Sequence, residues 1–150
     1  MSCLRVLKLT GAPARNITAV RPRIPLARSF HGSRAAHKHY LDATPEVFEK
    51  HVLQAANKEK LVIVDFYADW CGPCKMISPH LEKLTSDTAE TGGKEVDLVT
   101  VDVDAQPDLA IAHKIKSLPT VVAFRGGVQV GQFIGALPPP QLKKMVDSWL

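Results

Sequence analysis

Two cysteines three residues apart follow directly on a long apolar run, and this arrangement restricts the fold and chemistry of the chain more than any other feature. The run Leu61–Ala68 is apolar on both faces, which is typical of a buried central strand of a parallel sheet. Cys71 and Cys74 lie where this strand gives way to a helix. Residues i and i+3 share a helix face with Cβ atoms about 5–6 Å apart, and a small adjustment reaches the roughly 3.5–4.5 Å that a disulfide needs. The spacing therefore predicts a pair that forms and breaks a disulfide while the fold stays unchanged.

Residues 38–150 alternate between patterns typical of helices and patterns typical of strands. Thr44 provides a helix cap, and Pro45 suits the first helical position. The predicted helices are 47–56, 72–88 with a kink at Pro79, 107–114 and 138–150. The predicted strands are 61–68, 96–102 and a hairpin formed by 120–124 and 128–134. This alternation predicts an α/β domain.

Charge is distributed unevenly along the chain. Residues 1–37 hold seven of the 19 basic residues and no acidic residue, which leaves 12 basic against 15 acidic residues, a net charge of −3, over 38–150. The main part of the chain is mildly acidic, so we expect no nucleic-acid partner. No apolar run approaches the roughly 18 residues of a membrane span. Outside the basic segment only Cys71 and Cys74 remain, which leaves no cysteine for structural disulfides and suits a reducing compartment.

The N-terminal segment, 1–37, has the composition of an organellar transit peptide, because it is rich in Arg, contains Ser and lacks acids. A secretory signal needs about 7–15 unbroken apolar residues, whereas Arg and Pro interrupt every candidate run here. The stretch Arg28–His37 resembles the two-step processing signal of mitochondrial matrix precursors, which implies cleavage near Phe30 and again near His37. We therefore expect a mitochondrial transit peptide, 1–37, and a mature domain, 38–150. A basic tail that stays attached is the alternative.

An ordered set of motifs extends over nearly all of residues 39–150. The motifs are Asp65-Phe66-Tyr67-Ala68-Asp69-Trp70-Cys71-Gly72-Pro73-Cys74-Lys75, Val101-Asp102-Val103-Asp104, Ser117-Leu118-Pro119-Thr120, Phe124-Arg125-Gly126-Gly127 and Gly135-Ala136. In this order and at these separations they resemble the thioredoxin family. The resemblance implies the thioredoxin fold, a central mixed β-sheet of about five strands flanked by about four helices. Together with the N-terminal segment, it implies a mitochondrial member from a fungus or a similar eukaryote.

The same resemblance implies a thiol–disulfide oxidoreductase, mainly monomeric and without a bound cofactor. Electrons would pass from NADPH through thioredoxin reductase to disulfides in other proteins, with peroxiredoxins and methionine sulfoxide reductases as substrates expected for the family. Gly72-Pro73 between the cysteines is similar to reducing thioredoxins, whereas oxidising isomerases of this fold usually carry Gly-His. An oxidase or isomerase is therefore one alternative. A binding subunit that uses the fold as a scaffold is another.

The two cysteines are expected to have different roles. Cys71 lies at the helix start, where unpaired N–H groups carry roughly +0.5 charge and favour the thiolate, so it is the predicted nucleophile. Cys74 lies one turn further in and is predicted to stay protonated until it resolves the mixed disulfide. Half of a zinc site is the alternative, but the sequence has no second pair of ligands at suitable spacing. We therefore expect no metal.

Asp65 is an acid within an otherwise apolar strand. Burial raises the pKa of such a carboxyl. The family resemblance implies that Asp65 accepts the proton of Cys74, directly or through water. A structural acid at a strand end is the alternative. The family often places a lysine near this acid, whereas this chain has Thr100 at that position.

A shallow apolar rim for substrate peptides is expected around Cys71. The resemblance implies a cis peptide bond before Pro119, which would expose the Leu118 backbone for strand-like pairing with a substrate. Trp70 is expected to cover the incoming peptide. The predicted substrate-binding residues are Trp70, Gly72, Pro73, Leu118, Pro119, Ile134 and Gly135. The histidines show no catalytic spacing, and solvated or capping roles are expected for His31, His37, His39, His51, His80 and His113.

Overall fold

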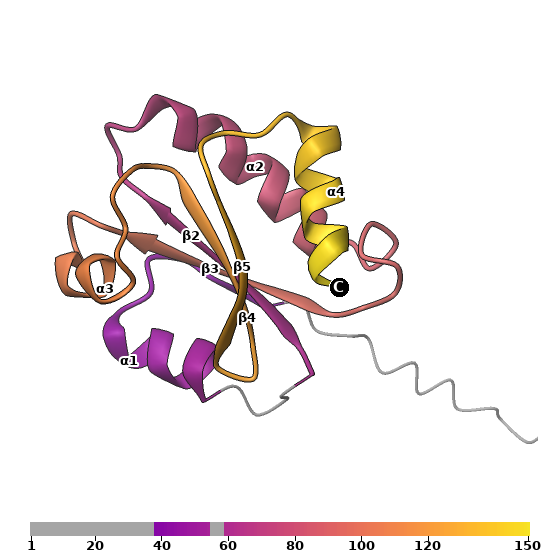
Figure 1. Cartoon of the computed structure of the whole chain (residues 1–150), viewed down its shortest axis with the longest axis horizontal. Coiled ribbons are helices and arrows are strands. Elements are labelled where there is room, and N and C mark those ends of the chain that lie inside the picture. Colours follow the sequence, from indigo (N-terminus) through magenta and orange to yellow (C-terminus); the bar gives the residue numbers. More distant parts are fainter. Residues whose placement is uncertain (1–37, 55–58) are drawn as a thin grey trace, which may run out of the picture. The chain divides into compact units, whose positions relative to one another are not determined.

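The computed structural model describes residues 38–54 and 59–150, so the predicted transit peptide, 1–37, lies outside the described residues. The described residues form a five-stranded mixed sheet with helices on both faces (Figure 1). The strands are β1 (His39–Tyr40), β2 (Leu61–Tyr67), β3 (Val96–Asp102), β4 (Thr120–Arg125) and β5 (Val128–Ile134). Their spatial order is β1-β3-β2-β4-β5, with β1 and β2 parallel to β3, β4 antiparallel to β2, and β5 antiparallel to β4. The predicted α/β fold with a mixed sheet of about five strands is confirmed.

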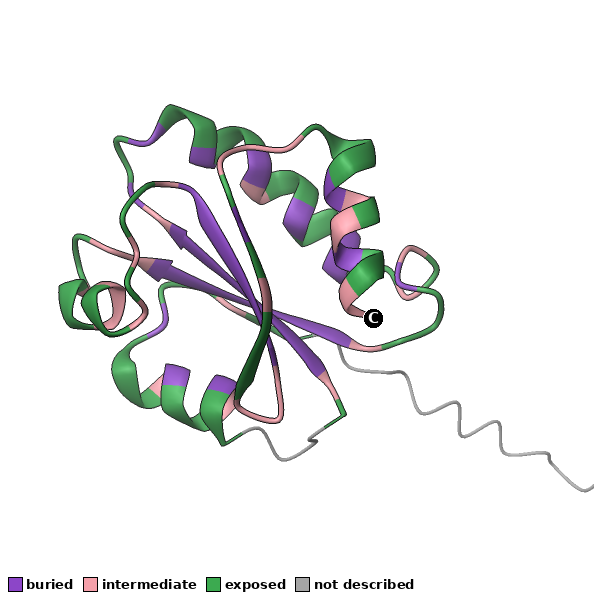
Figure 2. Ribbon diagram, viewed as in Figure 1, coloured by how far each residue is buried: buried purple, intermediate pink, exposed green. Residues whose placement is uncertain are grey.

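The helices form the two outer layers. They are α1 (Pro45–Phe48), a π-helical turn η1 (Glu49–Leu53), α2 (Gly72–Ser86), α3 (Pro107–Ala112) and α4 (Pro139–Trp149). In Figure 1, α2 and α4 cover one face of the sheet, and α1 and α3 lie on the other. Because both faces are covered, the central strands are buried along nearly their whole length (Figure 2).

The alternation of side chains along β2 determines which of them face α2. Leu61 and Ile63 pack into the apolar cluster formed with α2 and α4, whereas Val62, Val64 and Phe66 pack into the cluster on the opposite face. Successive strand residues point to opposite faces, so the next odd-numbered residue after Ile63 points toward α2. The alternation therefore places Asp65 on the face of the sheet that α2 covers, and the two cysteines lie at the start of α2.

The predicted helix 47–56 is wrong in type beyond Phe48. Thr44 caps the start as predicted, because its hydroxyl accepts a hydrogen bond from the Val47 N–H at 3.4 Å. The Gln54 N–H then donates to the Glu49 carbonyl, five residues back, at 2.8 Å, which makes the turn π-helical. The apolar residues of a single turn do not distinguish this pattern from an α-helix. Residues 55 and 56 lie outside the described part of the chain.

The other helix ends also differ slightly from the prediction. α2 continues through Pro79 and ends at Ser86, two residues before the predicted end. The Asp87 side chain accepts a hydrogen bond from the Ala89 N–H at 2.9 Å, so this short polar side chain supports a turn in place of another helical turn. The helix predicted as 107–114 likewise ends at Ala112.

The expectation of solvated or capping histidines is wrong for His113. Its ring is half-buried and packs against Phe48, Phe66 and Phe124, with centroid distances of 4.8, 5.8 and 5.6 Å. Burial lowers the pKa of His113. His113 follows the end of α3, so its sequence position suggests a loop residue, while the fold turns its ring into an aromatic cluster.

Candidate redox site

Cys71 and Cys74 are joined by a disulfide at the start of α2. Their Cα atoms are 5.3 Å apart, within the usual range for a disulfide, so the predicted disulfide between them is confirmed. Cys71 is the N-cap of the helix, and its Sγ accepts a hydrogen bond from the Cys74 N–H at 3.2 Å. Pro73 lies within the first helical turn, where a missing N–H costs nothing. The helix start therefore presents its positive end to the sulfur of Cys71.

The two cysteines differ little in solvent exposure, although they lie at different positions along the helix start. In the disulfide, Cys71 is 4% exposed and Cys74 is 1% exposed. Both pack against Ala68, with Tyr67 and Leu118 at the edge of the same cluster. Any difference in reactivity therefore arises mainly from the place of each sulfur along the helix start and from its neighbours.

Asp65 lies buried on the α2 side of β2, as the alternation of that strand requires. It is 1% exposed, and its Oδ2 accepts a hydrogen bond from the Ser78 hydroxyl of α2 at 3.0 Å. Its Oδ1 is buried and has no hydrogen-bond partner among the described residues. Burial raises the pKa of Asp65 to about 6, while the bond from Ser78 acts in the opposite direction. A carboxyl with this pKa changes its protonation near neutral pH, which suits proton exchange.

Thr100 is the Cα partner of Asp65 on the neighbouring strand β3. Its hydroxyl accepts a hydrogen bond from the Asp42 N–H at 2.9 Å, and its carbonyl accepts one from the Ala43 N–H at 2.8 Å. Asp42 has a φ of +54°, and its carboxylate accepts a hydrogen bond from the Tyr67 hydroxyl. That bond raises the pKa of Tyr67. Thr100 therefore fixes the turn between β1 and α1.

A cavity of about 350 Å³ lies beside Cys74 and Ser78. Thr100 and Tyr67 contribute to its wall, and the exposed Glu82 lies at its edge. Asp65 reaches this cavity through the hydroxyl of Ser78. Cys74 therefore lines a cavity whose wall also includes exposed residues.

Of the residues predicted to bind substrate, Leu118 packs at the edge of the cluster that holds both cysteines. Trp70 is 71% exposed, and its indole N–H donates to the Asp104 carboxylate at 2.8 Å. Trp70 and Leu118 line a shallow depression of about 320 Å³ together with Ile111. Asp104 and Ile111 lie beside Trp70 and were not among the predicted substrate-binding residues. Asp104 belongs to one of the sequence motifs, but its contact with Trp70 spans 34 residues and depends on the fold.

The second half of the rim is built around Pro119. The Leu118–Pro119 peptide bond is cis, as expected. The Pro119 carbonyl accepts a hydrogen bond from the Gly135 N–H at 2.8 Å, and Gly135 has a φ of +90°, which glycine adopts at little cost. Ile134 is exposed beside it. Gly72 and Pro73 are exposed at the helix start.

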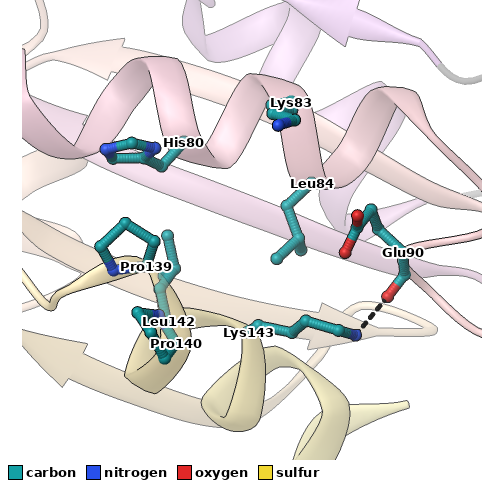
Figure 3. Close-up of a pocket in the computed structure, with 8 residues that line it drawn as sticks. All are labelled: His80, Lys83, Leu84, Glu90, Pro139, Pro140, Leu142 and Lys143. Carbon is teal, nitrogen blue, oxygen red and sulfur yellow. Dashed lines mark hydrogen bonds between the residues drawn. The ribbon is translucent and has the colours of Figure 1, made fainter.

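A second cavity of about 350 Å³ lies between α2 and α4 and contains neither cysteine (Figure 3). His80, Lys83 and Leu84 contribute from α2. Lys143 from α4 donates to the Glu90 carbonyl at 2.7 Å and pairs with Asp147 at 3.1 Å. The ammonium group of Lys143 is thus already engaged within the protein.

Neither a metal cluster nor a membrane helix is found in the described part of the chain. Over 38–54 and 59–150, no group of three or more His, Cys, Asp or Glu side chains is arranged to hold a metal ion. No helix in these ranges combines the length and apolar character needed to cross a membrane.

Comparison with known proteins places the chain in a family. The thioredoxin family model matches residues 39–148. Thioredoxin from Chlorobaculum thiosulfatiphilum is 38% identical over 109 residues, which cover 73% of this chain and 94% of the relative. The mitochondrial thioredoxin of Rattus norvegicus is 38% identical over 122 residues, covering 81% and 69%. A solved thioredoxin from Malassezia sympodialis superposes with a TM-score of 0.62 at 34% identity, covering 75% of this chain and 91% of that one.

Fold, disulfide and family match agree over the same residues. The family model extends over all five strands and over both cysteines. Cys71 and Cys74 are joined in the oxidised form, and the reduced form of such a pair carries two electrons. The chain therefore belongs to the thioredoxin family and is a thiol–disulfide oxidoreductase that carries electrons on Cys71 and Cys74.

Proposed function

We propose that this protein reduces disulfides in other proteins within mitochondria and recovers its electrons from NADPH through a thioredoxin reductase. The observation that carries the proposal is the Cys71–Cys74 disulfide at the positive end of α2, with the buried Asp65 on the same side of the sheet. The pair Gly72-Pro73 between the cysteines favours reduction over oxidation of substrates. The fungal origin implied by the resemblance stays a prediction.

The first step is attack by Cys71. Its thiolate, stabilised by the helix start, attacks one sulfur of a substrate disulfide. The Cys71–substrate bond forms as the substrate S–S bond breaks, and the other substrate sulfur leaves as a thiolate that takes a proton from water. The product of this step is a mixed disulfide on Cys71.

The second step is attack by Cys74. Asp65 accepts the thiol proton of Cys74, and the resulting thiolate attacks Cys71. The intramolecular disulfide forms, the bond to the substrate breaks, and the second substrate thiol is released. The dithiol of the protein has then lost two electrons, which the substrate disulfide has gained.

The rim supports a broad choice of protein substrates. Trp70, Ile111 and Ile134 are large apolar side chains that are 71%, 73% and 57% exposed. They offer apolar contact area near the sulfurs and no deep pocket for a particular side chain. Peroxiredoxins and methionine sulfoxide reductases therefore remain substrates proposed at the level of the family.

The reduction potential of the Cys71–Cys74 pair tests the direction of the reaction. We expect a value near the roughly −270 mV of thioredoxin, and a value near the roughly −180 mV of protein disulfide isomerase would contradict it. The measurement is equilibration with glutathione buffers, followed by thiol trapping. With NADPH and a thioredoxin reductase, the protein should also reduce insulin catalytically, and the Cys71→Ser variant is the matched control.

Residues 1–37 are proposed to direct import into mitochondria and to be removed afterwards. Radiolabelled full-length chain should become protease-resistant and shorter when incubated with energised mitochondria, with its new N-terminus near Lys38. Mitochondria without a membrane potential are the control. Because transit peptides of plastids have a similar composition, chloroplasts form a parallel arm. Uptake by chloroplasts only, or a chain that stays full-length and outside both organelles, would contradict the proposal.

A further inference from the structure

Ser78 is the one side chain in the described residues that forms hydrogen bonds with both Asp65 and Cys74. It lies on α2, one turn after Cys74, and its hydroxyl is 3.0 Å from Asp65 Oδ2 and 3.0 Å from the Cys74 carbonyl oxygen. It also lines the cavity beside Cys74. Asp65 is fully surrounded by protein, whereas Ser78 is only half-buried. The hydroxyl therefore contacts the buried carboxyl of Asp65 and the backbone of Cys74, and its residue also faces the cavity.

A serine hydroxyl has one hydrogen to donate and two lone pairs with which to accept. When Asp65 is ionised, Ser78 can donate this hydrogen to Oδ2, and a bond to a charged acceptor is the stronger kind. When Asp65 is protonated, the acid can donate to Ser78 Oγ while Ser78 donates to the Cys74 carbonyl. The same geometry thus satisfies both protonation states, but it favours the ionised one.

The other groups around Asp65 do not replace this hydroxyl. On β3, the Thr100 hydroxyl accepts a hydrogen bond from the Asp42 N–H at 2.9 Å, and within the described residues it forms no hydrogen bond with Asp65. On β4, the Cα partner of Asp65 is the apolar Val121. The charged groups that line the cavity beside Cys74 are those of Asp42, Asp69, Lys75 and Glu82. All four of these residues are exposed, so solvent screens their charges.

We propose that Ser78 is a positioning residue for the resolving step, holding the Asp65 carboxyl against α2 beside Cys74 and stabilising its ionised form. This role rests on the proposed function of Asp65 as the proton acceptor of Cys74. The hydroxyl would also give the proton a short route from the buried carboxyl toward the cavity after the disulfide has closed.

The first test measures the titration of Asp65 in the oxidised full-length chain, in which Cys71 and Cys74 carry no ionisable thiol. The carbon-13 carboxyl signal of Asp65, assigned by its loss in Asp65→Asn, is followed from pH 3 to pH 9. Ser78→Ala should move the titration midpoint upward by about one pH unit, because the ionised form loses a charge-assisted bond. Ser78→Thr keeps the hydroxyl and should restore the midpoint. An unchanged midpoint in Ser78→Ala would overturn the proposal.

Ser86→Ala is the matched control on the same helix. The Ser86 hydroxyl donates to the Glu82 carbonyl, four residues back, as Ser78 does to Cys74, but it is exposed and has no bond to a carboxylate. This variant loses the same kind of helix contact and should leave the Asp65 midpoint unchanged. A shift of the midpoint as large as that of Ser78→Ala would overturn the proposal, because it would trace the effect to the helix.

The second test measures how fast the mixed disulfide on Cys71 resolves. Reduced full-length protein, with Cys3→Ser in every variant, is mixed with insulin, quenched in acid and analysed by mass spectrometry. Ser78→Ala should slow resolution about two- to fivefold at pH 6 and little at pH 9, because fewer Asp65 carboxyls are ionised at pH 6. In the Asp65→Asn background the same change should have no further effect. Equal slowing in both backgrounds would overturn the proposal.

The two tests separate this inference from the function on which it rests. If Asp65 were not the proton acceptor, Ser78→Ala would still move the Asp65 midpoint in the first test, while Asp65→Asn would leave the resolution rate unchanged in the second. If the coupling of Ser78 to Asp65 were absent, the midpoint would not move, while Asp65→Asn would still slow resolution.

Discussion

Replacing Cys71 by serine is expected to abolish reduction of protein disulfides. A serine hydroxyl cannot form the mixed disulfide, and Cys74 lies one turn further along the helix, away from the positive helix start that favours a thiolate. The measurement is insulin reduction driven by NADPH and a thioredoxin reductase. Thermal melting of the variant serves as the control for folding.

Replacing Cys74 by serine is expected to stop the reaction one step later. Cys71 still attacks a substrate disulfide, but no second thiol resolves the product, so substrate proteins should stay bound to Cys71. These adducts should be released by dithiothreitol and detected by mass spectrometry. If trapped substrates were recovered on the Cys71→Ser variant instead, the roles of the two cysteines would have to be exchanged.

Replacing Asp65 by asparagine is expected to slow resolution of mixed disulfides by about 10²–10⁴-fold where proton transfer limits the rate. Asparagine keeps the shape of the side chain and can still pair with Ser78, but it cannot accept a proton. The measurement is the lifetime of the mixed disulfide between pH 6 and pH 9. The slowing should diminish toward pH 9, because more of the Cys74 thiol ionises without a base as the pH rises.

The same substitution is expected to raise the melting temperature in a pH-dependent way. Burial raises the pKa of Asp65 from 3.8 to about 6, so between these values the folded protein binds more protons than the unfolded chain. Stability therefore falls as the pH rises through this window, by about 3 kcal/mol in total. Asp65→Asn removes this cost and should melt roughly 10 °C higher at pH 7.5, with little difference near pH 4.

Calorimetry of the oxidised wild type and variant at both pH values checks this expectation. Asp97 is a suitable second site, because it is also a buried strand carboxylate, but it pairs with Lys60 at 2.7 Å. Asp97→Asn should not become more stable than wild type at pH 7.5. If Asp65→Asn neither melted higher nor resolved disulfides more slowly, Asp65 would be a structural acid.

Much of the site could be predicted because its determinants are local. The i, i+3 spacing of Cys71 and Cys74 fixes their common helix face, and an apolar strand that precedes them fixes the burial of Asp65. The cis bond before Pro119 followed from the family resemblance and not from the residue pattern. For the cysteine pair and for Asp65, a short segment of sequence contained the information.

The contacts that tune the site could not be predicted, because they join segments through the fold. Ser78 reaches Asp65 only because α2 packs on the face of β2 toward which odd-numbered residues point. Asp104 contacts Trp70 because the fold brings together two residues that are 34 positions apart in the sequence. The aromatic surroundings of His113 arise in the same way, from helices and strands distant in sequence. Such contacts depend on helix placement, which hydrophobic periodicity does not specify.

The central claim is that Cys71 and Cys74 cycle between a disulfide and two thiols during turnover. It is tested most directly by counting thiols in the full-length chain with a thiol-specific reagent under denaturing conditions. Addition of NADPH and a thioredoxin reductase should add two thiols per chain, and subsequent addition of insulin should remove the same two while insulin gains an equal number. A thiol count that stays constant through both additions would contradict the account and favour a scaffold that binds partners without exchanging electrons.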